Sequence, residues 1–271
     1  MLTITDSLNI RVQDKIKILS TYIHSKIMFE LKIYNFALTW VEQTLDTVCF
    51  DYIRRWKELP VSACVKEFYS LNRIRGGMGR SSLKFLSEKL RLSNRYTLKN
   101  SKDEDVKKVW VESSGKFIES DVLLQNNASL KTAKAQLCKA QQDKNWSHII
   151  SLKIQGQSLQ EVICSISRQN ITLWSRFIEN SSSLIYNFAC KSVSQVLPTA
   201  ANLVRWKITT DSSCPLCKND QPQTNKHVLA NCSSPIALSR YTNRHNEVLQ
   251  LIMVELCDLE KPLYRSRFEH S

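Results

Sequence analysis

Residues 214–232 read CPLCKNDQPQTNKHVLANC, which places Cys214, Cys217, His227 and Cys232 in the spacing C-x(2)-C-x(9)-H-x(4)-C. Zn²⁺ in a structural site takes four tetrahedral nitrogen or sulfur ligands, and a C-x(2)-C turn directs two thiolates at one point. We expect Thr224 to cap a short helix that carries His227. The alternative is that these are ordinary buried cysteines beside a surface histidine. The pattern favours a structural zinc knuckle, whose four protein ligands leave no open position for catalysis by the metal.

The composition of the whole chain indicates a polyanionic partner. Its 271 residues carry 38 Lys and Arg against 25 Asp and Glu, a net charge of +13. Among polyanions, nucleic acid is the commonest partner of so basic a protein, although a merely soluble basic surface is the alternative. We therefore expect RNA, DNA or an RNA–DNA hybrid as partner.

The cysteines outside the zinc motif point to a reducing compartment. They are scattered singly in apolar surroundings, as is typical of reduced intracellular thiols. The N-terminal residues do not form a signal peptide, and the longest aliphatic run, Leu251–Val254, is too short to span a bilayer. We expect an intracellular, nuclear protein without a membrane partner.

The pattern along the chain predicts a mainly α fold. Only five glycines and six prolines occur, and apolar residues recur at spacings of three and four over residues 14–34. The tetrapeptide Ser101–Glu104 is typical of a capping box that opens a further helix. A set of aromatic and aliphatic residues is predicted to lie in the core rather than in a cofactor site, namely Trp174, Phe177, Ile178, Leu184, Ile185, Phe188, Val193 and Val196.

A glycine cluster followed by a basic helix is the candidate nucleic-acid interface. Residues 73–80 read RIRGGMGR, and no Gly-Lys-Ser/Thr follows, so this is not a nucleotide-binding P-loop. The glycines let backbone N–H groups approach phosphate, or they form a plain flexible turn. Several cations of the next helix fall within one-third of its circumference, either as a phosphate-facing stripe or as a solvated face. The candidate residues are Arg73, Arg75, Arg80, Lys84, Arg91, Arg95 and Lys99.

No catalytic centre is apparent. A polymerase holds two metal ions with paired carboxylates, and the chain contains no Asp-Asp pair. Asp103-Glu104-Asp105 lies where it would compensate a helix dipole. The sequence therefore predicts that the isolated chain is not an enzyme.

Several stretches together resemble the C-terminal half of polyproteins from non-LTR (LINE-type) retrotransposons, of the class with a restriction-like endonuclease. The similarity rests on KIMFELKIYNFALTW (26–40), YIRRWKELPVSACVKE (52–67), RGGMGRSSLKFLSEKLRL (75–92) and, most specifically, residues 197–249. It implies that the CCHC zinc ligands of that family are Cys214, Cys217, His227 and Cys232. In place of a usual apolar-Pro pair after the glycines stands Arg80-Ser81, which suggests a decaying copy.

The resemblance also implies a division of the chain. Residues 1–125 would be the helical thumb of a reverse transcriptase, 126–196 a helical linker, 197–245 the zinc knuckle, and 246–271 a C-terminal helix with a truncated tail. The polymerase palm and the endonuclease would be missing, which leaves a fragment that binds nucleic acid and zinc. The alternatives are a host-retained helical module for protein–protein contact and a partial copy of a complete RNA-directed DNA polymerase.

Overall fold

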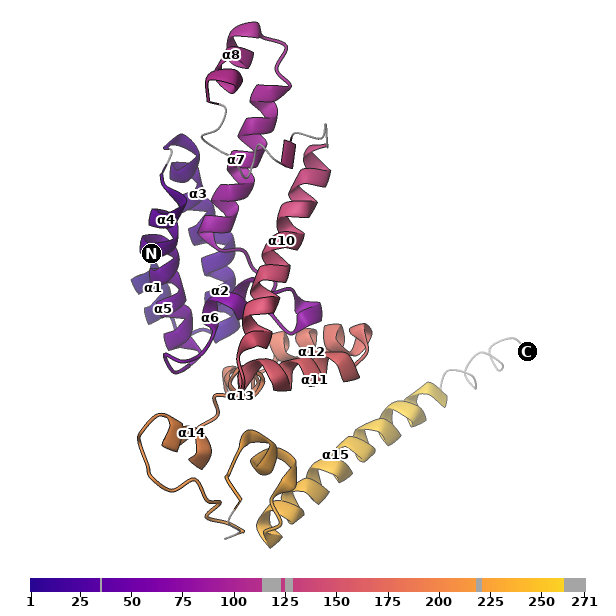
Figure 1. Ribbon diagram of the computed structural model, residues 1–271. Helices are drawn as coiled ribbons and strands as arrows, with labels where there is room; N and C mark the ends of the chain where they lie inside the picture. The colour runs from indigo at the N-terminus through magenta and orange to yellow at the C-terminus, as the bar shows by residue number, and fades with distance from the viewer. Residues whose placement is uncertain (35, 114–122, 125–128, 218–220, 261–271) are drawn as a thin grey trace, which may run out of the picture. The chain divides into compact units, whose positions relative to one another are not determined.

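The computed structural model describes residues 1–34, 36–113, 123–124, 129–217 and 221–260, and it is mainly α-helical (Figure 1). Among these residues there is no β-strand, and only Ser213 and Pro222 form an isolated antiparallel bridge. The predicted fold class is thus confirmed. The chain divides into two compact units, Met1–Val196 and Leu197–Ser271.

The first unit contains most of the helices. They are α1 (Leu2–Ser7), α2 (Val12–Ile18), α3 (His24–Ile33), α4 (Leu38–Trp40), α5 (Thr47–Trp56), α6 (Val65–Ser70), α7 (Leu83–Lys99), α8 (Glu104–Glu112), α10 (Leu130–Ser151), α11 (Gln155–Ser165), α12 (Arg168–Asn180) and α13 (Ser183–Val193). The second unit contains α14 (Ala200–Arg205) and α15 (Pro235–Glu260). In the described part of the chain, no helix combines the length and the apolar character needed to cross a membrane.

The amphipathic segment predicted over residues 14–34 forms one nearly continuous helical rod. It comprises α2, a π-helical turn over Leu19–Ile23, and α3. Ile16, Leu19 and Ile23 are almost completely buried, as the spacing of three and four requires. Burial of these aliphatic side chains stabilises the unit by roughly 1.5–3 kcal/mol each.

Helix α7, the longest described helix within residues 1–125, begins at a buried carboxylate. Asp46 is 2% exposed and accepts hydrogen bonds from the backbone N–H groups of Leu83 (2.7 Å) and Lys84 (3.0 Å). Ser82 caps the same turn by accepting from the N–H of Phe85 at 3.2 Å. A negative charge at a helix N-terminus also interacts favourably with the helix dipole. These bonds tie α7 to the helical turn that precedes α5.

Two apolar clusters join α7 and α10, which run side by side in Figure 1, to their neighbours. In the first cluster, Phe68 and Leu71 from the α6 region pack against Ile149 of α10 and Leu159 of α11. In the second, Leu92 of α7 packs against Leu124 and Ala133. The first unit therefore has a core of its own.

Two local predictions are corrected by the structure. Asp103, rather than Ser101, caps α8, because its side chain accepts from the N–H groups of Asp105 (2.9 Å) and Val106 (3.3 Å). Five residues that were predicted to lie in the core are between 46% and 81% exposed, namely Trp174, Phe177, Leu184, Ile185 and Phe188, whereas Ile178 and Val196 are buried. The apolar residues from Trp174 to Phe188 do lie on helices, α12 and α13, but their spacing alone does not reveal which face of each helix packs against the core.

The predicted four-part division stays a prediction. The expected boundary at residues 125 and 126 and the tail over 261–271 lie outside the described residues. The structure places residues 1–196 in one compact unit, which includes both the segment predicted as thumb and the segment predicted as linker.

A buried histidine makes the first unit sensitive to acid. His24 is 2% exposed, and burial lowers its pKa from 6.5 to about 4, although a backbone contact with Ser81 opposes the shift. The unfolded chain therefore takes up a proton at a higher pH than the folded chain does. Stability is lost as the pH falls from 6.5 towards 4, and the loss should reach about 3 kcal/mol.

We expect His24→Leu to remove most of this loss. Urea unfolding of the wild type and the variant at pH 7 and at pH 4.5 measures the difference, and the exposed His148→Gln serves as the control. The comparison between variants matters because buried Asp46, whose pKa burial raises, responds to acid in the opposite direction. An unchanged pH dependence in His24→Leu would contradict the prediction.

Candidate functional site

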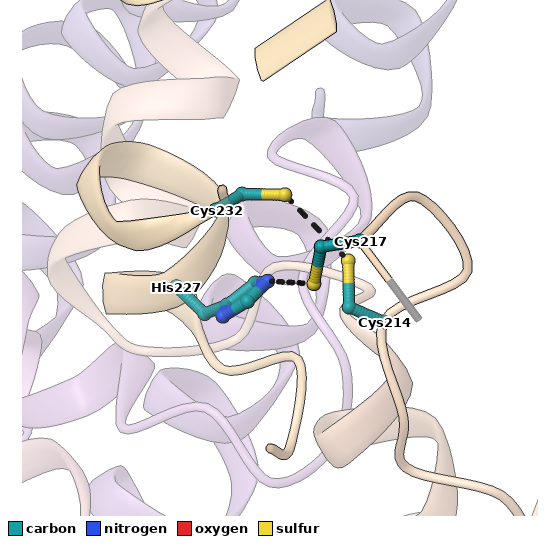
Figure 2. A group of neighbouring side chains, drawn as sticks. All are labelled: Cys214, Cys217, His227 and Cys232. Atoms are coloured by element: carbon teal, nitrogen blue, oxygen red, sulfur yellow. Dashed lines mark hydrogen bonds between the residues drawn. The ribbon is translucent and has the colours of Figure 1, made fainter. Parts of the chain in front are cut away.

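The side chains of Cys214, Cys217, His227 and Cys232 converge on one point in the second unit (Figure 2). Their potential ligand atoms all lie within 4.8 Å of one another. Cys214 Sγ is 3.9 Å from Cys232 Sγ, and Cys217 Sγ is 3.5 Å from His227 Nε2. Zn–S bonds of about 2.3 Å and Zn–N bonds of about 2.0–2.1 Å place tetrahedral ligand atoms roughly 3.5–3.8 Å apart. The two separations of 3.9 and 3.5 Å match such a site, so the four residues can hold a zinc ion.

Local backbone structure brings the four ligands together. The C-x(2)-C turn carries two of them, and Thr224 starts the short helical segment that carries His227. Thr224 Oγ1 accepts a hydrogen bond from the N–H of His227 at 3.2 Å, as predicted. Cys232 directly follows the end of the π-helical turn His227–Asn231. Ser234 then caps α15 by accepting from the N–H of Ala237 at 3.2 Å, with Pro235 at the first helical position.

The electrostatics of the C-x(2)-C turn favour the metal-binding form of its first cysteine. Burial alone would raise the pKa of Cys214, but hydrogen bonds from the backbone N–H groups of Cys217 and Leu216 lower it to about 6. His227 contributes in the same direction. Because the thiolate is the species that binds metal, this turn is suited to zinc near neutral pH.

Two residues around the ligands were not found from the sequence. Tyr241 of α15 accepts from the N–H of Cys232 at 3.2 Å, and its hydroxyl reaches the carbonyl oxygens of His227 (3.2 Å) and Val228 (3.0 Å). Gln223 Nε2 lies 3.7 Å from Cys214 Sγ, and its Oε1 accepts from the N–H of Ala200 at 2.8 Å. Tyr241 thus fixes the His227–Cys232 segment, and Gln223 connects the site to the start of α14. No spacing rule marks either residue.

Removal of the Tyr241 hydroxyl should weaken zinc binding without removing a ligand. Tyr241→Phe would leave the Cys232 N–H and a nearby carbonyl group without their partner, at a cost of about 1–3 kcal/mol. We expect zinc affinity to fall about 10- to 100-fold. Competition against a chromophoric chelator measures the affinity. Tyr22→Phe, on an exposed side chain of the first unit, is the matched control, and equal affinity in both variants would contradict the role given to Tyr241.

The glycine loop is folded differently from a phosphate cradle. The N–H groups of Gly77, Met78, Gly79 and Arg80 donate to the carbonyl oxygens of Asn72, Phe68, Leu71 and Tyr69 at 2.8–3.0 Å. These donors are therefore already used within the chain. The structure supports neither a backbone phosphate cradle nor a plain flexible turn, because the hydrogen bonds hold this loop against α6.

Arg73, Arg75 and Lys84, among the seven predicted nucleic-acid-binding cations, form ion pairs with carboxylates far away in the sequence. Arg73 pairs with Glu179 at 2.6 Å, Arg75 pairs with Asp143 at 3.0 Å, and Lys84 pairs with Glu42 at 2.5 Å. Arg75 also lies over the Trp146 ring, 5.6 Å from its centroid. These contacts hold the three side chains against other parts of the first unit.

The four remaining cations differ in their surroundings. Arg95 is 3% exposed, with its guanidinium 3.8 Å from the Trp110 ring centroid, so it presents no face to a phosphate. Arg91 donates to the carbonyl oxygen of Phe36, and burial lowers its pKa. Lys99 donates to the carbonyl oxygen of Leu124. Neither Arg80 nor Lys99 has a carboxylate partner in the part of the chain that the structure describes. The five cations predicted as a phosphate-facing stripe, Arg80, Lys84, Arg91, Arg95 and Lys99, thus do not form one continuous exposed surface, because Arg95 is buried.

The fold and the site together define a helical chain with a zinc-binding cluster of three cysteines and one histidine. Residues 163–237 match the model of a protein family described as zinc-binding in reverse transcriptase. The match contains all four ligands and begins in α11, well before the predicted start of the knuckle at residue 197. This segment is thus related to the zinc-binding region of reverse transcriptases, and zinc is its cofactor. No curated protein and no solved structure matches the chain.

Proposed function

We propose that this chain is the zinc-containing, nucleic-acid-binding part of a reverse transcriptase from a non-LTR (LINE-type) retrotransposon of the restriction-like-endonuclease class. The observation that carries the proposal is the zinc-binding tetrad inside the segment related to reverse transcriptases. The net charge of +13 supports a polyanionic ligand, and RNA, DNA and an RNA–DNA hybrid all supply one. A nuclear location would suit such a ligand.

In this proposal the chain binds and positions nucleic acid but has no polymerase or nuclease activity of its own. The zinc ion has four protein ligands, so its role is to stabilise the fold rather than to activate water. Extension of a primer on an RNA template with Mg²⁺, by a preparation free of contaminating polymerase, would contradict this part of the proposal.

Binding should depend steeply on salt and little on sequence. Each phosphate contact contributes about 0.7–0.9 to the slope of log affinity against log salt concentration. We expect Arg80→Gln with Lys99→Gln to flatten this slope by about 1.5, because neither cation has a carboxylate partner among the described residues. Arg95 is left out of the test because its replacement would disturb the packing on Trp110. Fluorescence anisotropy with single-stranded RNA, single-stranded DNA and a hybrid measures the slope.

The matched control removes the same charge elsewhere in the first unit. The double variant Lys134→Gln, Lys139→Gln removes two cations of α10. It should flatten the slope less than the Arg80→Gln, Lys99→Gln double variant does. If both double variants flatten the slope equally, attraction to the chain is diffuse and the thumb-like grip is contradicted. If the wild type binds none of the three ligands at about 150 mM salt, the physiological ionic strength, the proposal itself fails.

A second candidate function rests on the apolar surface of α12 and α13. Several large side chains there are exposed to between 46% and 81%, namely Leu173, Trp174, Phe177, Leu184, Ile185 and Phe188. Exposed aromatic and aliphatic side chains on neighbouring helices are typical of protein–protein contact. A host-retained module that binds a protein would use this surface. Substitution of Trp174 and Phe177 by serine would then abolish binding of the protein partner. It would leave the slope of log nucleic-acid affinity against log salt concentration unchanged.

A further inference from the structure

A basic pocket lies in the first unit, outside the zinc site. Its volume is about 300 Å³, and it is formed by α2, the glycine loop, the end of α12 and the start of α13. The charged residues that line it are Arg11, Asp14, Lys17, Arg73, Arg80 and Glu179. Pockets of about this size bind small ligands or single groups of larger ones.

The charges in the pocket do not cancel. Arg11 pairs with Asp14 at 2.9 Å, and Arg73 pairs with Glu179 at 2.6 Å. Lys17 and Arg80 have no carboxylate partner among the described residues. Four cations against two carboxylates give the lining a net charge of +2.

A buried lysine adds positive potential from outside the lining. Lys57 is 4% exposed, its Nζ lies 3.1 Å from Met78 Sδ and 5.1 Å from the centroid of the Tyr186 ring, and both of these residues line the pocket. Burial alone would lower the pKa of Lys57, but contacts with Cys190 and Tyr186 raise it, so the ammonium group stays charged.

The walls of the pocket are joined by hydrogen bonds between segments far apart in the sequence. Gln13 Nε2 of α2 donates to the carbonyl oxygen of Ser181 at 2.8 Å, and the Val12 N–H donates to Ser183 Oγ at 3.1 Å. On the other side, the N–H of Arg80 donates to the carbonyl oxygen of Tyr69 at 2.9 Å. The left-handed conformation of Gly79, with φ at +64°, makes the turn that precedes Arg80. The pocket is thus formed in advance of any ligand.

We propose that this pocket binds the 5′-phosphate at the end of a nucleic-acid strand. A phosphate monoester carries a charge of about −1.5 to −2 at pH 7, which matches the net charge of the lining. A phosphodiester within a strand carries a single negative charge and would leave one cation uncompensated. Arginine forms paired, charge-assisted hydrogen bonds with phosphate oxygens, and lysine adds a point charge. The inference rests on the proposed binding of nucleic acid and adds a preference for one end of the strand.

The test compares one single-stranded RNA oligonucleotide with a 5′-phosphate and with a 5′-hydroxyl group, by fluorescence anisotropy with the full chain. We expect the phosphorylated strand to bind at least about tenfold more tightly, because hydrogen bonds to charged groups are lost with the phosphate. Lys17→Gln and Arg80→Gln should each bring this ratio close to one. Lys17 is exposed, so its substitution leaves the fold intact, and the exposed Lys139→Gln of α10 should keep the wild-type ratio.

The possible outcomes separate this inference from the proposed function. Equal affinity for the two strands, with a steep salt dependence retained, would overturn the pocket assignment alone. Failure of both strands to bind would contradict the proposed function as well. If adenosine 5′-monophosphate or a phosphoserine peptide bound as tightly as the phosphorylated strand, the assignment to a nucleic-acid end would be overturned.

Discussion

Replacement of one zinc ligand, Cys217→Ser, is expected to abolish stoichiometric zinc binding and to unfold the knuckle. The reason lies in the small core of the second unit, where Cys214, Cys232 and Ala237 are buried with Cys217 and Tyr241 packed against them. Three of these five residues are zinc ligands themselves. Structural zinc sites contribute about 10–16 kcal/mol of folding free energy in isolated peptides, so little remains to hold the segment once the ion is lost.

The helices of the first unit should survive this substitution because they have separate apolar clusters. Elemental analysis measures zinc per chain, and hydrogen exchange read by mass spectrometry locates the loss of structure. Exchange should rise over residues 199–245 and stay unchanged over α2 and α7. The exposed Cys164→Ser is the matched control. Wild-type protein that is purified under reducing conditions and contains no metal would refute the zinc assignment.

Gly77→Ala is expected to destabilise the first unit by about 3 kcal/mol or more, a large part of a typical total stability. A Cβ atom at position 77 would lie 2.1 Å from the carbonyl oxygen of Leu71 and 2.5 Å from its carbonyl carbon. That carbonyl also accepts the N–H of Gly79 at 2.8 Å, and the Leu71 side chain is fully buried. Neither residue 77 nor Leu71 can move away from this contact without breaking a hydrogen bond or disturbing the packing of the core.

Gly79→Ala provides a graded comparison in the same loop. Gly79 has a φ of +64°, but an added Cβ would meet Arg73 Cγ at 3.6 Å, which is an ordinary contact. Gly79→Ala should therefore lower the free energy of unfolding only by the strain of an alanine in the left-handed conformation, about 1–2 kcal/mol. Urea unfolding followed by far-ultraviolet circular dichroism gives both free energies. If Gly77→Ala were less harmful than Gly79→Ala, the close packing of this loop on α6 would be disproved.

The sequence by itself determined the zinc site and the helical class. All four ligands fall within residues 214–232, so their spacing alone restricts them to one local structure that a tetrahedral metal can use. Helical periodicity is equally local, which is why the rod over residues 12–33 was predicted nearly to its ends. Thr224 was predicted as a cap for the same reason.

The tertiary structure decided which cations remain available to bind phosphate. Arg73 meets Glu179 across 106 positions, and Arg75 meets Asp143 across 68 positions, so no helical wheel of α7 or its loop could reveal these pairs. Arg95 belongs to the predicted stripe by its spacing, yet Trp110 of α8 covers it. The pocket around Lys17 and Arg80 likewise exists only because α2 and the glycine loop come together. Charge is a property of the sequence, but its compensation depends on contacts between distant segments, which only folding establishes.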